Sequence, residues 1–190
     1  RGDAGQVAAM GDVLGRLIAL HLRPTPDHPT AAQQLAHALA LLHAEDGPLP
    51  KSVRRTPPDV AKLTGMLDQA SALGSSGATA EAAGQSLDDL ERLLDVSELR
   101  GPGFDLLDPL GALSPRGRPG PVRVELKTTS TALTAGGSLR VRLTVNEARR
   151  ALEGSSSPLS MPYLLRIYHD SSEHALPALA AEIADPAGRL

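Results

Sequence analysis

PYLLRIYH, residues Pro162–His169, is the segment on which the interpretation of this chain depends, and SLRVRLTV, residues Ser138–Val145, is its expected partner. In both segments large apolar side chains recur at every second position. A period of two places such side chains on one face of an extended chain, and in the second segment Arg140, Arg142 and Thr144 lie on the opposite face. We therefore predict two β-strands, each with one face in the core.

A third segment with the same period lies upstream. In Val122–Lys127, valine and leucine alternate with arginine, glutamate and lysine, which is typical of an antiparallel strand with one core face and one solvated face. Ala135-Gly136-Gly137 is a turn signal between this strand and the next. We expect a helical turn at Glu147–Leu152, and the apolar spacing of His174–Leu190 leaves strand and short helix both open.

The front of the chain has the helical period instead. Apolar residues recur at spacings of three and four in Gln6–Leu22, in Ala31–Ala44, after Thr56-Pro57-Pro58-Asp59, and from Thr79 to near Leu99. Thr30 precedes the second of these segments and can accept hydrogen bonds from the first turn of a helix. The third begins at Thr56-Pro57-Pro58-Asp59, a strong helix start, because Pro is tolerated in the first turn and an acidic group there meets the positive end of the helix dipole. We therefore predict about four helices.

These patterns predict the α+β class: an N-terminal helical subdomain of about four helices, then a small antiparallel β-sandwich-like subdomain. We expect the helical subdomain in residues 1–100, a Pro/Gly-rich linker in residues 101–121 and the antiparallel β subdomain in residues 122–190. Phe104 and the leucines of the linker are expected to pack in part against the domain.

Composition narrows the classes of function. The 190 residues include 19 Lys and Arg against 22 Asp and Glu, without a block of basic residues that would attract a nucleic-acid backbone. The absence of Cys excludes disulfides, thiolate catalysis and Cys-based zinc or iron–sulfur sites. No apolar run approaches the roughly 20 residues that cross a bilayer. We expect neither a nucleic-acid partner nor a membrane span within this segment.

One polar cluster, His169-Asp170-Ser171-Ser172-Glu173-His174, contains metal-ligand residue types. Its spacing differs from the His-Glu-x-x-His and His-x-x-Glu-His patterns that place two imidazoles on one helical face, so we interpret it as a solvated turn. The other histidines lack carboxylates at ligand spacing, and we interpret them as surface or helix-end residues: His21, His28, His37 and His43. The sequence also lacks Gly-x-Ser-x-Gly and the glycine-rich phosphate loops. We predict no catalytic, cofactor-binding or metal-binding residue, no cofactor, and no enzyme activity.

Two longer segments, Leu35–Ser76 and Ser138–His174, share an order of motifs with a known family. The first has a helix ending in Ala-Glu, a short loop, a Thr-Pro helix start and a second helix closing in Leu and Ser-Ser. The second has a strand, a loop, a Pro-Tyr-Leu strand and a Ser/Glu/His turn. This order resembles the GPCR-autoproteolysis-inducing (GAIN) domain of the polycystin family, receptor-like subunits that assemble with polycystin channels. The resemblance covers about Thr30 to Glu182.

The resemblance implies a non-catalytic interaction module on the extracellular side of a large membrane protein, near the membrane. Its implied partners are other protein chains or other domains of the same polypeptide. The family's β-sandwich ends in a self-cleaving His-Leu-Thr/Ser step, and this chain lacks that tripeptide, because His28-Pro29-Thr30 and His169-Asp170-Ser171 both depart from it. No catalytic residue is therefore transferred. Since the chain begins at Arg1 without Met, we expect an internal part of a longer polypeptide or a processed start.

Two other hypotheses remain open. The chain could be a structural subunit of a large intracellular assembly, docking through the Leu-rich faces of its helices. It could be an enzyme if the cluster at His169–His174 converged with acidic groups elsewhere. Sequence after Leu190 that adds strands, a His-Leu-Thr/Ser step and apolar spans would favour the first hypothesis, and a gene ending there would favour the assembly subunit. Stoichiometric metal, lost on replacing His169 and His174, would favour the enzyme.

Overall fold

The structure is a computed structural model that describes residues 4–45, 58–72, 78–97, 103–113, 120–130, 141–156, 161–169 and 177–186. Its elements are α1 (Ala4–Leu22), α2 (Ala31–Glu45), α3 (Val60–Ser71), α4 (Ala78–Leu94), β1 (Leu106–Asp108), β2 (Val122–Thr129), α5 (Val145–Ser156), β3 (Tyr163–His169) and β4 (Ala178–Ala184). The predicted α+β class is confirmed, with helices in the N-terminal part and strands in the C-terminal part.

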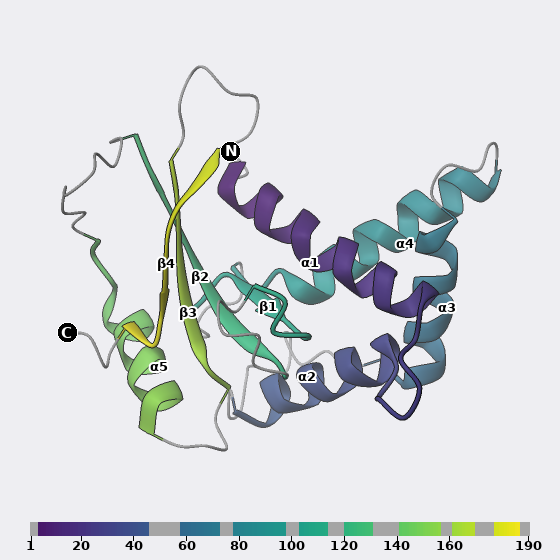
Figure 1. Cartoon of the computed structure of the whole chain (residues 1–190), viewed down its shortest axis with the longest axis horizontal. Helices are drawn as coiled ribbons and strands as arrows, with labels where there is room; N and C mark the ends of the chain where they lie inside the picture. The colour runs from purple at the N-terminus through teal and green to yellow at the C-terminus, as the bar shows by residue number, and fades with distance from the viewer. Residues whose placement is uncertain are drawn as a thin grey trace, which may run out of the picture.

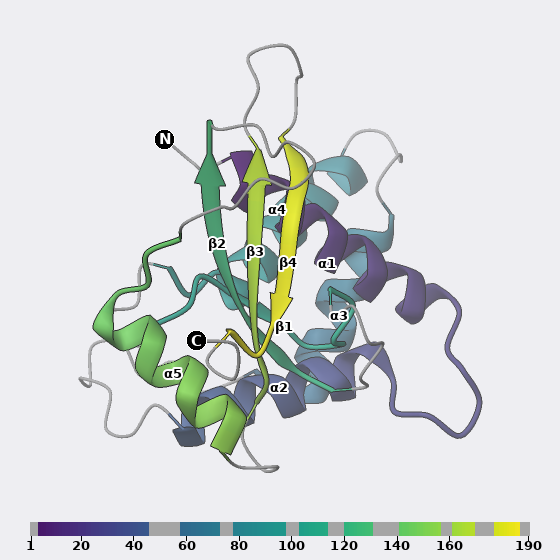
Figure 2. The ribbon, with the colours of Figure 1, turned by 60° about the vertical axis from the view of Figure 1, so that its left-hand side comes forward.

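The elements form layers around the sheet. Figure 1 shows α5 on one side of the strands and the helices α1–α4 on the other side. Figure 2, turned toward the sheet, shows α5 running obliquely to the lower left of the strands, in front of α2. Helical cover on both sides explains why the two central strands are buried along most of their length, β2 from Val122 to Leu126 and β3 from Tyr163 to Tyr168.

The strands form one four-stranded sheet in the order β1-β2-β3-β4. The outer pairings, β1 with β2 and β3 with β4, are antiparallel, but β2 and β3 run parallel with Val124 opposite Leu164. The prediction of an antiparallel, sandwich-like arrangement is therefore wrong for the described residues. The reason is α5, which follows β2 and precedes β3, because a parallel pair needs a crossover and a helix is the usual one. For His174–Leu190 the sequence allowed either a strand or a short helix, and this segment contains strand β4.

The prediction of a strand at Ser138–Val145 is also wrong within its described part. Residues 141–144 are not strand, and Val145 begins α5; Ser138–Arg140 lie outside the described residues. The cause is a capping box: Thr144 Oγ1 accepts a hydrogen bond from Glu147 N at 3.3 Å, and Thr144 N donates to Glu147 Oε2 at 2.8 Å. The helical turn expected at Glu147–Leu152 is confirmed and extends to twelve residues.

The cap of α2 is as predicted, and α3 begins at Val60, directly after the predicted helix start, with Asp59 as a cap rather than a residue of the first turn. Thr30 Oγ1 accepts a hydrogen bond from Gln33 N at 3.2 Å, and Asp59 Oδ1 accepts one from Lys62 N at 2.8 Å. The fourth helix is shorter than predicted, because it ends at Leu94 rather than near Leu99. Beyond Leu94 the chain turns toward the strands: Asp95 pairs with Leu106, and Val96 N donates to Asp105 O at 3.0 Å.

A continuous hydrophobic core joins the helical and strand halves. The leucine stripes of the helices are buried in it, as Leu35, Leu63, Leu67, Leu90 and Leu94 show. The described residues of 101–121 also contribute to this core. They include strand β1, and their Phe104, Leu106, Leu107 and Leu113 are all buried.

None of the helices in the described part of the chain combines the length and the apolar character that crossing a membrane requires.

Candidate functional site

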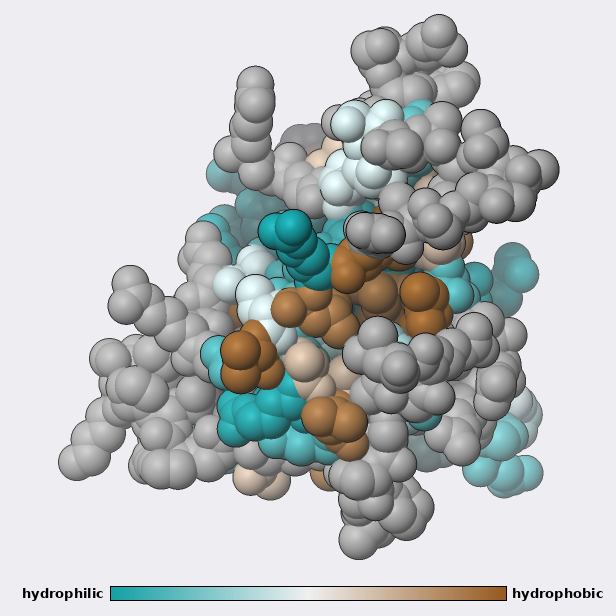
Figure 3. All heavy atoms as spheres, turned by 90° about the vertical axis from the view of Figure 1, so that its left-hand side faces the viewer, coloured by the Kyte–Doolittle hydropathy of each residue, from teal (hydrophilic) through white to brown (hydrophobic). Residues whose placement is uncertain are grey.

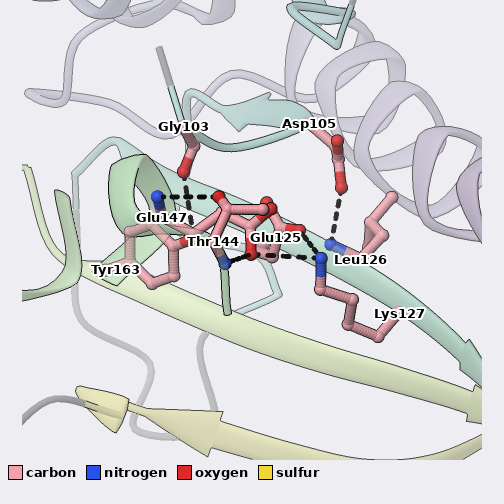
Figure 4. A network of polar contacts seen from close by, with 8 residues as sticks. All are labelled: Gly103, Asp105, Glu125, Leu126, Lys127, Thr144, Glu147 and Tyr163. Atoms are coloured by element: carbon pink, nitrogen blue, oxygen red, sulfur yellow. Dashed lines mark hydrogen bonds and ion pairs between the residues drawn. The ribbon is translucent and has the colours of Figure 1, made fainter. Parts of the chain in front are cut away.

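A buried polar network lies between β2 and α5. Arg123 and Glu125 are each only 2% exposed, so the prediction that this face of Val122–Lys127 is solvated is wrong. Lys127 Nζ lies 2.5 Å from Glu125 Oε1 and 3.2 Å from Glu147 Oε2 (Figure 4). Arg123 Nη1 lies 3.5 Å from the backbone oxygen of Arg150 in α5. These contacts attach the helix to the sheet.

The network holds more carboxyl groups than its one ammonium group balances. Burial raises the pKa of Glu125 to about 8, and the charge of Asp105 acts in the same direction. Burial alone would lower the pKa of Lys127, but its hydrogen bonds and charge interactions with Glu125 and Glu147 raise it. Near neutral pH Glu125 therefore keeps its proton and accepts a hydrogen bond from the Lys127 ammonium, while Glu147 is the ionised partner.

Two further groups complete the network shown in Figure 4. The Tyr163 hydroxyl of β3 donates to the backbone oxygen of Gly103 at 3.0 Å, and burial raises the pKa of this hydroxyl. Leu126 N donates to Asp105 Oδ2 at 2.9 Å, and burial raises the pKa of that carboxyl as well. These bonds join the chain before β1 to both central strands. The network is a structural connection among four segments.

A second polar cluster lies on the other face of the sheet. Arg166 Nε donates to Glu182 Oε2 at 2.7 Å, and Arg166 Nη1 donates to the Tyr168 hydroxyl at 3.0 Å. The same guanidinium lies 3.7 Å from Asp12 Oδ2 in α1. Arg166 thus connects β3 to the edge strand β4 and to the helical layer, although its position in PYLLRIYH gave no sign of such contacts.

A groove of about 460 Å³ lies between α1 and α4, and we call it the α1/α4 groove. Its lining residues come from the start of α1 and the end of α4: Gln6, Val7, Met10, Asp88, Glu91, Arg92 and Asp95. Asp88 and Glu91, three positions apart, lie on one face of α4, and Asp95 directly follows the last residue of this helix, Leu94. The groove therefore combines an apolar part, Val7 and Met10, with an acidic rim.

Exposed apolar side chains mark another surface. On α5, Val145 is 85% exposed and Leu152 is 59% exposed. With Arg149 they recur at spacings of four and three, so they lie on one face of the helix, which we call the α5 surface. Figure 3 looks onto the side of the molecule that carries α5 and shows hydrophobic side chains gathered near its middle, among hydrophilic ones.

No family model, curated protein or solved structure matches this chain. The resemblance to the polycystin GAIN domain stays a hypothesis.

The histidines singled out in the sequence do not come together. His169 ends β3, and residues 170–174 of the suspected metal cluster lie outside the described residues. His21 Nε2 lies 2.8 Å from Asp68 Oδ1, which connects α1 to α3 across 47 positions of sequence. Within the described ranges, no group of three or more His, Asp or Glu side chains is arranged to hold a metal ion.

Sequence reasoning missed both candidate surfaces, although signals for them were present. Asp88, Glu91 and Asp95 have helical spacing, but nothing local indicates that α1 lies beside them. Thr144-x-x-Glu147 is a capping-box signature that would have predicted the start of α5 and hence the exposed position of Val145. The alternation in Ser138–Val145 favoured a strand instead.

Proposed function

We propose that this chain is a non-catalytic protein-interaction module in the ectodomain of a polycystin-type membrane protein, where it binds other domains of the same polypeptide or other chains. The observation that carries the interaction role is the α5 surface, where Val145 and Leu152 are exposed. An exposed apolar cluster on one helical face gains free energy when a partner removes it from water. The polycystin assignment rests on the order of motifs in Leu35–Ser76 and on the Pro-Tyr-Leu strand within Ser138–His174. The first strand expected in that second segment gives it no support, because residues 141–144 are not strand and Val145 begins α5.

The docking surface on which the assembly-subunit hypothesis depended is not accessible. It relied on the leucine stripes of the helices, yet Leu35, Leu63, Leu67 and Leu90 lie in the core of the chain itself. A partner could reach these side chains only if the helices separated, which would expose the whole core to water. We therefore propose the α5 surface, and not the leucine stripes, as the place where a partner binds.

Site-specific photocrosslinking tests the interaction role. A photoreactive amino acid is placed at position 145 or 152 of the chain in cells that produce it, and at position 19 as a control, since Ala19 is an exposed residue of α1. We expect the same defined protein or domain to be cross-linked from positions 145 and 152 and not from position 19. Identical products from all three positions, or none from the α5 surface, would show that this surface binds no partner.

Labelling of intact cells tests the proposed location separately. A biotin reagent that does not cross membranes should modify an epitope-tagged form of the native gene product on intact cells, with a cytoplasmic protein as the unlabelled control. Labelling only after the cells are opened would contradict an ectodomain, and it would leave the interaction role to be decided by the crosslinking experiment.

A further inference from the structure

The α1/α4 groove differs from the α5 surface in its chemistry. Met10 is 7% exposed at its apolar part, whereas Asp88 and Glu91 are exposed at its rim. Its volume of about 460 Å³ falls within the range of about 300–1,000 Å³ that is usual for ligand sites. The groove therefore has room for side chains of a partner, and those side chains would meet methyl and thioether groups below and carboxylates above.

The charge balance of the rim is negative. Three lining residues are carboxylates, Asp88, Glu91 and Asp95, and one is a guanidinium, Arg92. Arg92 Nη1 already lies 3.5 Å from the Asp89 carboxylate of its own helix, which is not part of the lining. The guanidinium therefore contributes less than a full opposing charge, and the groove attracts cations.

Lysine and arginine fit this combination because they are amphipathic. Their aliphatic stems cover apolar surface while the charged end stays at the polar rim, where it forms charge-assisted hydrogen bonds with carboxylates. A metal ion fits less well, because the acidic side chains of the rim do not form a group arranged to hold one. A purely apolar segment would leave the carboxylates desolvated and unpaired, which is unfavourable.

We propose that the α1/α4 groove binds a segment of a partner protein in which a Lys or Arg side chain is adjacent to an apolar one. The inference rests on the proposed interaction role, but it concerns a different surface from Val145 and Leu152. The basic group pairs with Asp88 and Glu91, and the apolar neighbour packs on Val7 and Met10. Because the ion pairs are at the rim, binding weakens as the salt concentration rises.

The test uses random 12-residue peptides displayed on phage and selected on the intact chain. Recovered peptides are then measured by fluorescence polarisation against the wild type, the variant D88N/E91Q and the variant D27N/E81Q. Both variants remove two carboxylates, but Asp27 and Glu81 are exposed residues that do not line the groove. Asn tolerates the left-handed backbone conformation of Asp27, whose φ is +63°. Asp95 is kept, because its Oδ1 accepts hydrogen bonds from Ser97 N and Ser97 Oγ. Equal melting temperatures check that both variants are folded.

We expect the recovered peptides to be enriched in Lys or Arg beside an apolar residue. Their Kd should rise about tenfold or more in D88N/E91Q and stay unchanged in D27N/E81Q. Failure to recover binding peptides, recovery of peptides without basic residues, or equal loss in both variants would overturn the proposal. So would concentration-dependent dimerisation that D88N/E91Q abolishes, since the occupant would then be a second copy of the chain. The two proposals can fail separately. If positions 145 and 152 cross-link a partner but no peptide binds the groove as expected, the proposed interaction role stands and only the proposed ligand of the α1/α4 groove is rejected.

Discussion

Glu125 shows how one residue on a strand can make the stability of the protein depend on pH. Its carboxyl group is buried between β2 and α5, and burial raises its pKa from 4.5 to about 8. The folded state therefore binds a proton that the unfolded chain releases near pH 4.5. A raised carboxyl pKa contributes stability that is fully present below the unfolded value and is lost as the pH rises through the folded value.

The substitution Glu125→Gln tests this effect. Gln keeps the size and the hydrogen-bond acceptor but cannot ionise, so the variant should match the wild type below about pH 4.5. Between the two pKa values the wild type should lose up to about 1.4 kcal/mol of unfolding free energy per pH unit relative to the variant. Urea unfolding from pH 4 to pH 9 measures the difference. Parallel curves for the two proteins would mean that Glu125 is ionised in the folded state at neutral pH.

At the scale of elements, the position of α5 depends on close packing against the segment that precedes β1. Gly103 has a backbone φ of +70° and approaches the first turn of α5 so closely that an added Cβ would lie 2.8 Å from the backbone oxygen of Asn146. Glycine adopts this conformation without the steric cost that other residues have. The approach also places the Gly103 oxygen where the Tyr163 hydroxyl can donate to it.

Gly103→Ala should therefore destabilise the protein by about 2 kcal/mol or more, since backbone strain and a steric clash act together. Gly11→Ala is the matched control. Gly11 lies within α1, an added Cβ would meet nothing within 4 Å, and Ala is the better helix former by about 1 kcal/mol. Thermal unfolding should show a lower melting temperature for the first variant and an equal or higher one for the second. A neutral Gly103→Ala would show that α5 shifts to accommodate the methyl group.

At the scale of the whole molecule, the shared core predicts cooperative unfolding. Buried side chains of α1–α4 belong to the same cluster as those of β2 and β3, so neither half can unfold without exposing apolar surface of the other. Far-ultraviolet circular dichroism reports mainly the helices. Tyrosine fluorescence reports β3, because both tyrosines of the chain, Tyr163 and Tyr168, lie in that strand.

We expect the two signals to follow one transition in urea. Two separate transitions, with the helical signal lost independently of the tyrosine signal, would instead support independent folding of residues 1–100 and 122–190, the division that the sequence suggested.

The sequence by itself determined the elements whose signals are local. The helical period, with Thr30 as a cap and Thr56-Pro57-Pro58-Asp59 as a helix start, predicted α1–α4, and alternation predicted β2 and β3, because these features depend on neighbours a few positions away. The same alternation wrongly predicted a strand at Ser138–Val145, where the capping box of Thr144 and Glu147 starts α5 instead. The parallel pairing of β2 with β3, the burial of Glu125, and the groove that brings Val7 beside Asp88 were decided only by the tertiary structure. Alternation of charged residues with valines predicts a solvated face, but α5 covers that face of β2. A period of two shows only which side chains share a face of the strand, and not whether solvent or another element lies on that face.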